Sequence, residues 1–169
     1  MTNATETKAI ETKSAIETNN STETNNAIET KSAIEIEIPA RADYVSLVRL
    51  VVAAAAELAS GLGPARIDDL RVAVSEATTN AIGAHISSGC TRPVRVCCEC
   101  SSEQVAVTVV DEGPGFDADA LEEMPPVESP ERLSRESGMG ISIIRMLADE
   151  VCFRSASRGT EVSLIIKAP

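Results

Sequence analysis

The chain has 169 residues, of which 43% are apolar and 24% charged, so it is long enough for one globular domain with a core. It has no Trp, one Tyr and two Phe, so the core must be aliphatic and the aromatic platforms of single-strand binders are missing. Acidic residues outnumber basic ones by 26 to 15, and the resulting net charge of −11 argues against nucleic acid as a direct partner.

Membrane and secreted classes are disfavoured as well. The most apolar stretch, residues 47–59, contains Arg49 and Glu57 and is too short to span a bilayer. The N-terminus lacks the basic and apolar segments of a secretory signal. Four of the five cysteines crowd into residues 90–100, which is not the spacing of a disulfide framework. We therefore expect a reduced, cytoplasmic protein that has no membrane partner.

The N-terminal segment repeats with a period of six residues. A glutamate recurs at the same place in each hexad: Glu11, Glu17, Glu23, Glu29 and Glu35. Hexads with one aliphatic residue are compatible with a parallel β-helix. However, one apolar residue in six buries too little surface to offset the entropy of ordering the chain. We predict that residues 1–33 form a low-complexity, disordered extension and that 34–169 form the folded domain.

The rest of the chain predicts elements in the order β, α, α, β, β, loop, α, β, β. The expected bounds are 34–38, 43–60, 64–88, 94–100, 105–109, 112–137 for the loop, 139–149, 151–156 and 161–167. Asp43 is expected to be the N-cap of the first helix, and Pro64 opens the second. Neighbouring strands with helices outside them predict an α/β sandwich (α+β) with one sheet covered on one face.

Glu76 and Asn80 lie four residues apart in the second predicted helix, so both side chains project from one face, one turn apart. That face differs from the apolar stripe of the helix. A carboxylate and an amide oxygen placed this way suit a hard cation such as Mg²⁺, or a general base beside a metal-bound phosphate. A solvated polar face is the alternative, since acidic helix residues mostly face water.

Two glycine-containing segments follow. Asp111 comes directly after a strand and is followed by Gly113 and Gly115, which suits either a ligand's hydrogen-bond donor or an ordinary turn. Gly138 and Gly140 open a later helix, where exposed N–H groups and the helix dipole favour phosphate. A dinucleotide fingerprint is rejected, because the preceding strand and the third glycine are missing, and no GK[ST] sequence forms a Walker A loop.

In combination and in this order, these segments resemble the GHKL ATPases, the superfamily that includes gyrase and histidine kinases. Within it, the chain is similar to the anti-sigma factor serine kinases. The resemblance covers about residues 34–167 and rests on IEIEIPARADYVSLVRLVV, AVSEATTNAI, VVDEGPGFD, SGMGISIIRMLADEV and GTEVSLIIK. It implies the GHKL or Bergerat-type fold, with a mixed, mostly antiparallel sheet. A histidine kinase would also need a phospho-acceptor His in a dimerisation helix pair, whereas the sole His follows Asn80.

The resemblance also implies roles for individual residues, with ATP and Mg²⁺ as cofactors. Asn80 would coordinate the Mg²⁺, and Glu76 would be the general base. Asp111 would receive the adenine amino group. The adenine pocket and the phosphate contacts would be completed by Gly113, Gly115, Gly138, Met139, Gly140 and Thr160. The 112–137 loop would be the ATP lid, and its Arg132 and Arg135 would reach the γ-phosphate. Since aromatics are scarce, we expect no aromatic stack for adenine.

Two features depart from the family pattern or stand apart from it. Members often carry a His four residues after the motif Asn, where this chain has Ala84; here His85 comes one place later. One residue rotates a helical side chain by about 100°, so we expect His85 to be structural or exposed rather than catalytic. Cys98 and Cys100 share a strand face opposite Cys97, which favours buried apolar filling over a metal site.

The resemblance implies an anti-sigma factor that binds and inhibits a sigma factor. It would use Mg-ATP to phosphorylate a serine on an anti-anti-sigma (STAS-type) protein, and homodimers are usual in the family. A nucleotide-gated protein-binding module without kinase activity is the alternative. A third possibility is an α/β domain that binds no nucleotide and whose glycines only make turns.

Overall fold

The computed structural model describes residues 32–115, 139–155 and 159–169. Its elements are β1 (Ser32–Ile38), α1 (Asp43–Ala59), α2 (Pro64–Ser88), β2 (Val94–Cys100), β3 (Gln104–Asp111), α4 (Met139–Leu147), β4 (Glu150–Ser155) and β5 (Thr160–Lys167). The expected order of helices and strands is confirmed over these residues. β1 starts at Ser32, two residues before the start expected for the domain. Residues 1–31 and most of the predicted lid, with Arg132, Arg135 and Gly138, lie outside the described residues.

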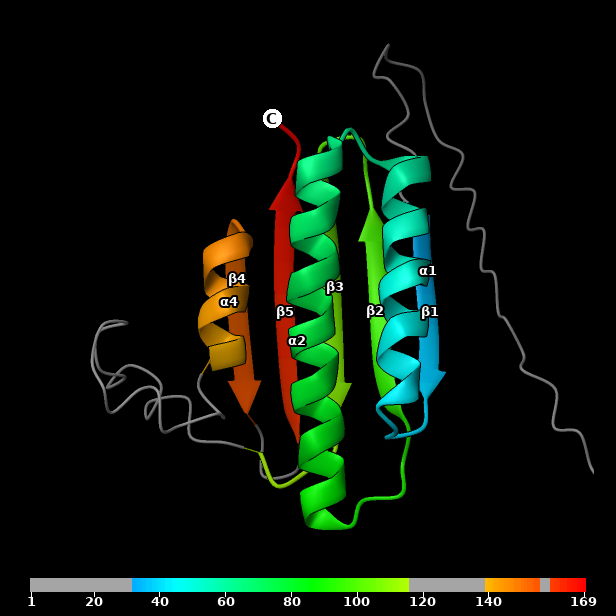
Figure 1. The fold of residues 1–169 in the computed structure, drawn as a ribbon, viewed down its shortest axis with the longest axis vertical. Helices are drawn as coiled ribbons and strands as arrows, with labels where there is room; N and C mark the ends of the chain where they lie inside the picture. Colours follow the sequence, from blue (N-terminus) through cyan, green and yellow to red (C-terminus); the bar gives the residue numbers. More distant parts are fainter. Residues whose placement is uncertain (1–31, 116–138, 156–158) are drawn as a thin grey trace, which may run out of the picture.

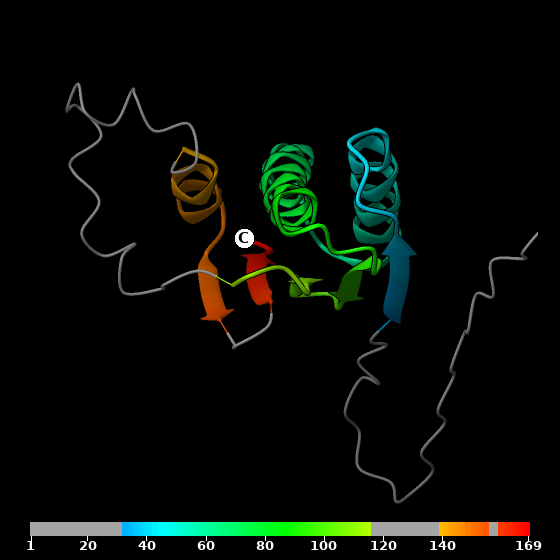
Figure 2. The same cartoon turned by 90° about the horizontal axis from the view of Figure 1, so that it is seen from below.

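The strands form one five-stranded sheet in the order β1-β2-β3-β5-β4, and each neighbouring pair is antiparallel. The helices α1, α2 and α4 all lie on one face of it (Figures 1 and 2). This is the predicted α/β sandwich covered on one face. Strand alternation explains it, because apolar side chains at every second position need cover on a single face only.

The register lines up apolar side chains across the whole sheet. One row crosses all five strands: Ile36, Val96, Val109, Val162 and Phe153. The next row consists of Ile34, Cys98, Val107, Leu164 and Val151. The buried side of α2, including Leu70, Val74 and Ala77, belongs to the same core. The aliphatic core expected from the composition is therefore built between the sheet and these helices.

The N-cap of α1 corrects the sequence prediction. Asp43 is the first helical residue, and the capping position belongs to Ala42, which makes no side-chain capping bond. The backbone of Ala42 is already helical, with φ −56 and ψ −31, whereas a capping side chain needs an extended backbone to reach the free N–H groups. Asp43 instead pairs with Arg41 at 2.7 Å and places its charge in the first turn, where the helix dipole favours an anion.

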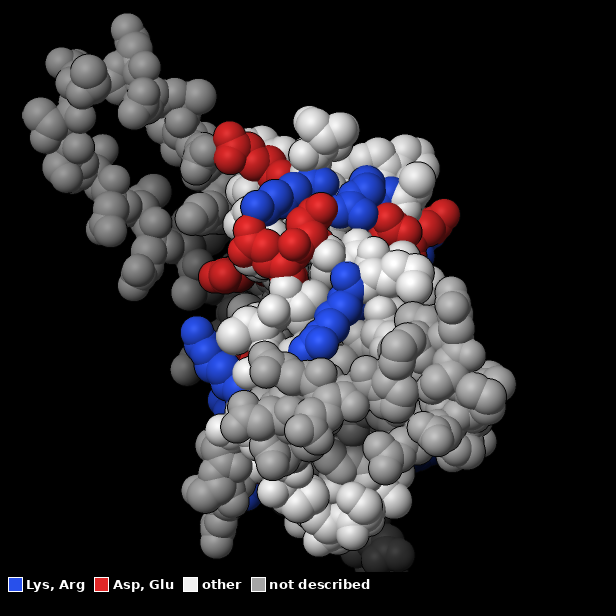
Figure 3. Space-filling model, turned by 90° about the vertical axis from the view of Figure 1, so that its left-hand side faces the viewer, with Lys and Arg blue, Asp and Glu red and all other residues white. Residues whose placement is uncertain are grey.

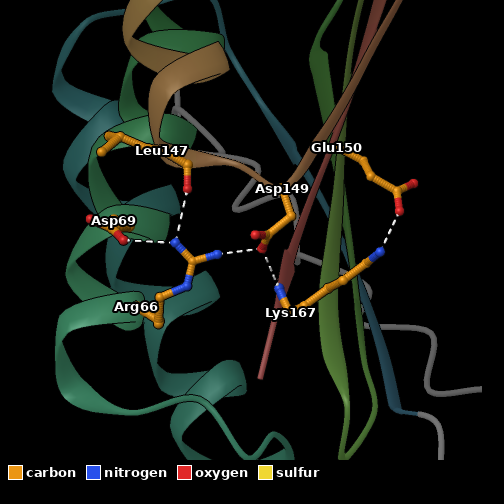
Figure 4. Close-up of polar contacts among 6 residues, drawn as sticks. All are labelled: Arg66, Asp69, Leu147, Asp149, Glu150 and Lys167. Carbon is orange, nitrogen blue, oxygen red and sulfur yellow. Dashed lines mark hydrogen bonds and ion pairs between the residues drawn. The ribbon is translucent and has the colours of Figure 1, made fainter. Parts of the chain in front are cut away.

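α4 runs antiparallel to α2 (Figure 1), and its C-terminal end is tied to α2 by Arg66 (Figure 4). The Arg66 guanidinium donates to the Leu147 carbonyl at 3.1 Å and to the Asp69 carboxylate at 2.9 Å, and it also pairs with Asp149. The Asp149 carboxylate accepts the backbone N–H of Lys167 at 2.8 Å. These bonds fix the turn from α4 into β4 and so orient α4 on the sheet.

On the described part of the face seen from the α4–β4 side, basic side chains lie among acidic ones (Figure 3). Ion pairs of this part of the chain include Arg66–Asp149, Arg154–Glu161 and Lys167–Glu150. In the described ranges, no helix is both long and apolar enough to cross a membrane.

Candidate functional site

A cavity of about 350 Å³ opens between α2, the start of α4 and the ends of β3, β4 and β5. This volume lies within the usual range of small-molecule sites. Four of the predicted site residues line it: Asn80, Asp111, Gly115 and Thr160. The other lining residues are Ala77, Thr79, Ala81, Gly83, Ala84, Val109, Ile141, Phe153 and Val162. Residues that are far apart in the sequence thus converge on one concave, mostly apolar site.

Glu76, Asn80 and Gly140 meet where the first turn of α4 crosses α2. A Cβ atom built on Gly140 would lie 2.8 Å from Glu76 Oε2 and 3.3 Å from Asn80 Nδ2. Gly140 is buried, whereas Asn80 is exposed and Glu76 half-buried. Because glycine has no side chain, the α4 backbone comes close to the carboxylate and the amide. The N-terminal end of a helix, which attracts anions, therefore lies beside an acid and a neutral oxygen donor.

Asp111 ends β3 and is buried, with 6% of its surface exposed. It lies opposite Thr160 of β5, which is also buried. Burial raises the pKa of the Asp111 carboxyl above its usual value, and hydrogen bonds from Gly113 and Thr160 partly offset this effect. A desolvated carboxylate at the end of a strand is a strong acceptor for a ligand's N–H group.

Two glycines allow the chain to pack closely around Asp111. The Gly113 N–H donates to Asp111 Oδ1 at 2.8 Å, and a Cβ on Gly113 would lie 2.9 Å from the Ala84 Cβ. Gly159 has a φ of +91, and its added Cβ would lie 2.0 Å from the Asp111 carbonyl oxygen. Its N–H donates to the Gly113 carbonyl at 2.8 Å. The backbone at Gly159 thus packs directly against the backbone at Asp111, at a distance that only glycine permits.

Comparisons with known proteins agree with this geometry. Residues 38–166 match the profile of the histidine kinase-like ATPase domain. The chain belongs to that family. It is 34% identical over 134 residues to the serine-protein kinase RsbW of Staphylococcus epidermidis, a match that covers 77% of this chain and 83% of the relative. Identity to the RsbW of a Staphylococcus aureus strain is 32% over 133 residues, covering 76% and 82%.

A solved structure of the RsbU and RsbW domains of a Mycobacterium tuberculosis protein also has this fold. Its TM-score is 0.57 at 18% identity, with 80% of this chain covered. This chain spans 31% of that longer one, and the likeness concerns the fold alone. Together, the comparisons confirm the predicted superfamily, the fold and the enzyme class, a protein kinase with an ATPase domain.

The structure of this ATPase domain adds Phe153, which the sequence reasoning missed. Its side chain lines the cavity from β4, in the row of Val162 and Val109, and next to the row of Asp111 and Thr160. The Arg145 guanidinium lies 5.5 Å from the ring centroid. An aromatic side chain therefore lines the cavity, which the scarcity of aromatic residues did not lead us to expect; the absence of an aromatic stack for adenine stays a prediction. Alternation puts Phe153 on the same strand face as Val151, but only the strand order of the sheet brings it to the cavity that Asp111 also lines.

The predicted burial of Cys98 and Cys100 is confirmed. Cys98 and Cys100 are buried at 2% exposure each, with their sulfur atoms 3.6 Å apart, and Cys97 is half-buried on the opposite face. The hydrogen bond to Cys100 and burial raise the pKa of the Cys98 thiol, so this thiol stays neutral. Within the described ranges, no group of three His, Cys, Asp or Glu side chains is placed to hold a metal ion.

Proposed function

We propose that this chain is an anti-sigma factor that binds a sigma factor and phosphorylates a serine of an anti-anti-sigma (STAS-type) protein with Mg-ATP. The observation that carries the proposal is the approach of Gly140 to both side chains: its Cβ position lies 2.8 Å from Glu76 Oε2 and 3.5 Å from Asn80 Oδ1. A carboxylate and an amide oxygen beside the N-terminal end of a helix support binding and transfer of a phosphate group. The relatives named serine-protein kinase support the same assignment.

The cavity suits the adenosine part of ATP. The adenine amino group would donate to the Asp111 carboxylate, with Thr160 beside it. Gly115 would leave room for the base, Gly113 would hold Asp111 through its N–H, and Phe153 would form an aromatic wall. The phosphates would extend toward Gly140 and the N–H groups at the start of α4, with Met139 as its first residue. Apolar walls with a few fixed polar groups are typical of such sites.

The oxygen donors fit Mg²⁺ held in the manner of nucleotide kinases. Mg²⁺ prefers to keep several waters and to bind substrate phosphates through one or two protein oxygens, rather than a full protein cage. The described residues offer no cage of three acidic side chains, but the Asn80 amide lies beside the α4 N-terminus. Asn80 would hold the ion, which would supply positive charge to the β- and γ-phosphates.

Glu76 would act as the general base. The serine hydroxyl of the substrate would attack the γ-phosphorus of ATP, the Glu76 carboxylate would take the hydroxyl proton, and ADP would leave. The new bond joins serine oxygen to phosphorus, and the bond between the γ-phosphorus and the bridging oxygen breaks. Since such a transition state needs little covalent help, catalysis would rest on positioning and charge neutralisation.

Charge favours the proposed partners. The net charge of −11 suits a partner with a basic surface, such as a DNA-binding sigma factor, and would speed association more than it would set affinity. The exposed leucines Leu47, Leu50 and Leu58 on α1 offer apolar area for a protein contact. A homodimer in the cytoplasm, which does not bind nucleic acid directly, completes the proposal.

The deciding experiment compares Glu76→Gln with the wild-type chain. Transfer of the labelled γ-phosphate to the antagonist should fall to background, while Mg-ATP binding by calorimetry stays within about threefold, since the amide keeps the shape of the side chain but is not a base. Glu99→Gln is the matched control, because Glu99 is an exposed residue of β2. It should transfer phosphate at the wild-type rate.

Each contrary result has a separate meaning. Normal transfer by Glu76→Gln overturns the general-base role. ATP binding without transfer by the wild-type chain points to the nucleotide-gated binding module instead. Absence of Mg-ATP binding to the wild-type chain overturns both. Binding of a purified sigma factor, measured with and without ATP, tests the anti-sigma role independently of the chemistry.

A further inference from the structure

His85 is fully buried, at 0% exposure, in the last turn of α2, behind the proposed nucleotide cavity. It does not line that cavity. Its ring lies between two loops: Nδ1 is 3.1 Å from the carbonyl oxygen of Arg92, and Nε2 is 2.7 Å from the backbone nitrogen of Glu112. Arg92 precedes β2, and Glu112 follows β3. One imidazole therefore joins α2, the α2–β2 loop and the end of β3.

These two partners decide the tautomer of the ring. A backbone nitrogen can only donate, so Nε2 of His85 accepts the Glu112 N–H and carries no proton. A carbonyl oxygen can only accept, so Nδ1 carries the proton and donates it to Arg92. The ring is thus a neutral imidazole with both nitrogens used. It is a fixed connector between a donor and an acceptor of the backbone.

The bond to Glu112 acts directly on the nucleotide side of the fold. The Glu112 nitrogen belongs to the peptide group that also holds the Asp111 carbonyl, so His85 fixes the plane of that peptide. At the opposite edge of the same peptide, the Asp111 carbonyl oxygen packs so closely against Gly159 that a Cβ there would lie 2.0 Å from it. The peptide after Asp111 is therefore bonded at its N–H and closely packed at its carbonyl oxygen, next to the Cα atom from which the Asp111 carboxylate projects.

Neighbouring contacts strengthen the same arrangement. The side chains of Arg92 and Glu112 form an ion pair on the surface beside the ring. Ala84, the residue before His85, lies against Gly113, whose N–H donates to Asp111. The small side chain of Ala84 allows the Asp111–Gly113 turn to pack against α2. The imidazole of His85, the next residue, then accepts the backbone N–H of Glu112 within that turn.

We propose that His85 is a positioning residue for the nucleotide base, acting through the Glu112 N–H to aim the Asp111 carboxylate. This inference rests on the proposed ATP site. Its consequence is a split between the kinetic constants: loss of the acceptor at Nε2 weakens ATP binding and raises KM, while kcat at saturating ATP stays near the wild-type value. Glu76 and Asn80 are not moved by the change.

Two variants of similar size separate the functions of the two ring nitrogens. His85→Asn places an amide nitrogen near Nδ1 and keeps the donor for Arg92, but it leaves the Glu112 N–H unpaired. His85→Gln has the length to place an amide oxygen near Nε2 and so restores the acceptor. A buried donor left unpaired is costly, so His85→Asn should raise the Kd for Mg-ATP by roughly tenfold. His85→Gln should stay within about threefold of the wild-type Kd, because an amide oxygen also accepts.

Calorimetry with Mg-ATP and steady-state kinetics with the antagonist protein give Kd, KM and kcat for each variant. Arg92→Gln is the control, because it removes the surface ion pair but keeps the carbonyl that His85 binds. Equal Kd values for His85→Asn and the wild-type chain would overturn the inference. A parallel fall of kcat in His85→Asn would also overturn it. Absence of ATP binding by the wild-type chain would instead defeat the proposed function itself.

The wild-type protein supplies a second test, which does not depend on the folding of a variant. Nitrogen-15 NMR of the His85 ring should show a protonated Nδ1 and an unprotonated Nε2. Hydrogen exchange of the Glu112 amide should slow when ADP binds, more than that of the Ser101 amide, which bonds to Gln104 at the opposite end of β3. The opposite tautomer, or equal slowing of both amides, would overturn the inference.

Discussion

The two ends of α4 are held against α2 in different ways. At the C-terminal end, Arg66 reaches across with a charged side chain that is 29% exposed, and its partner Asp149 is 40% exposed. At the N-terminal end, the backbone of Gly140 lies directly against the side chains of Glu76 and Asn80. The first contact is made by a long, charged side chain that is partly exposed to solvent. The second is short and depends on the absence of a side chain.

The difference shows where this fold tolerates change. Exposed ion pairs contribute little, because water and salt screen them and two long side chains must be ordered. At the Gly140 end, an added methyl group would displace the Glu76 carboxylate, which is the end of a flexible side chain, so the effect falls on the position of the proposed base rather than on stability. We therefore expect large functional effects at the Gly140 end and small, salt-dependent stability effects at the Arg66 end.

The largest expected effect is that of Gly140→Ala. The added Cβ would lie 2.8 Å from Glu76 Oε2, so the carboxylate or the helix must shift. A misplacement of about 1 Å in an active site can cost roughly 100-fold in rate, and we expect a loss of that size in phosphate transfer. The melting temperature should stay the same or rise, because alanine favours a helix by up to about 1 kcal/mol over glycine.

Gly63→Ala is the matched control for this variant, because it adds the same methyl group at a position with nothing within 4 Å of the new Cβ. Its transfer rate should equal that of the wild-type chain. Wild-type transfer by Gly140→Ala would show that the close contact at the N-terminal end of α4 is not needed for the reaction.

The next effect concerns the buried carboxylate at the same end of the molecule. Burial raises the pKa of Asp111, so the folded chain takes up this proton at a higher pH than the unfolded chain. As pH falls through the raised value, Asp111 should therefore add to stability, while Mg-ATP binding weakens because a charged acceptor is lost. Stability and affinity move in opposite directions in this window above the usual aspartate range.

Asp111→Asn checks this prediction. The amide oxygen still accepts a hydrogen bond, but without charge, so we expect the Kd for Mg-ATP to rise about fivefold at neutral pH. The dependence of Kd on pH in this window should disappear. Calorimetry at a series of pH values measures both quantities. An unchanged pH profile in the variant would mean that another group controls it.

Arg66→Met should have a smaller effect, on stability alone. It removes the bonds to Asp69, Leu147 and Asp149 but keeps most of the apolar stem. We expect a loss of about 1 kcal/mol in the free energy of unfolding by urea at low salt, since the groups are partly exposed. The loss should shrink in 1 M salt. A loss that does not depend on salt would show that packing, not charge, holds this end of α4.

The same residues show which parts of the fold and of the candidate site the sequence predicts. Glu76 and Asn80 were found because helical spacing places them on one face, and Pro64 and the glycine after Ser88 marked the ends of α2. Motif order pointed to Asp111 and Thr160, and the sheet register then placed them side by side. These features are local, or belong to a recognisable order of motifs.

The positions of Phe153 and His85 could be known only from the three-dimensional fold. Phe153 reaches the cavity because β4 pairs with β5 at the edge of the sheet, a long-range choice that alternation along one strand cannot reveal. His85 is expected from the helix alone to be structural or exposed; only the positions of Arg92 and Glu112 show that both ring nitrogens are used. The N-cap of α1 was misassigned because the backbone of Ala42, not the preference of Asp43, decides it.

The smallest expected effect is that of Lys167→Met, which serves as a comparison for Arg66→Met because it also removes a surface ion pair. The Lys167 side chain pairs with Glu150, and both side chains are about half exposed, at 49% and 57%. Its backbone N–H, which binds Asp149, does not depend on the side chain. We therefore expect no measurable change in the midpoint of urea unfolding at low or high salt. Arg66→Met, in contrast, should lower this midpoint at low salt. If both variants lost equal stability, the three bonds of Arg66 would add nothing beyond an ordinary surface pair, and the C-terminal end of α4 would owe its position to the core around Ile144.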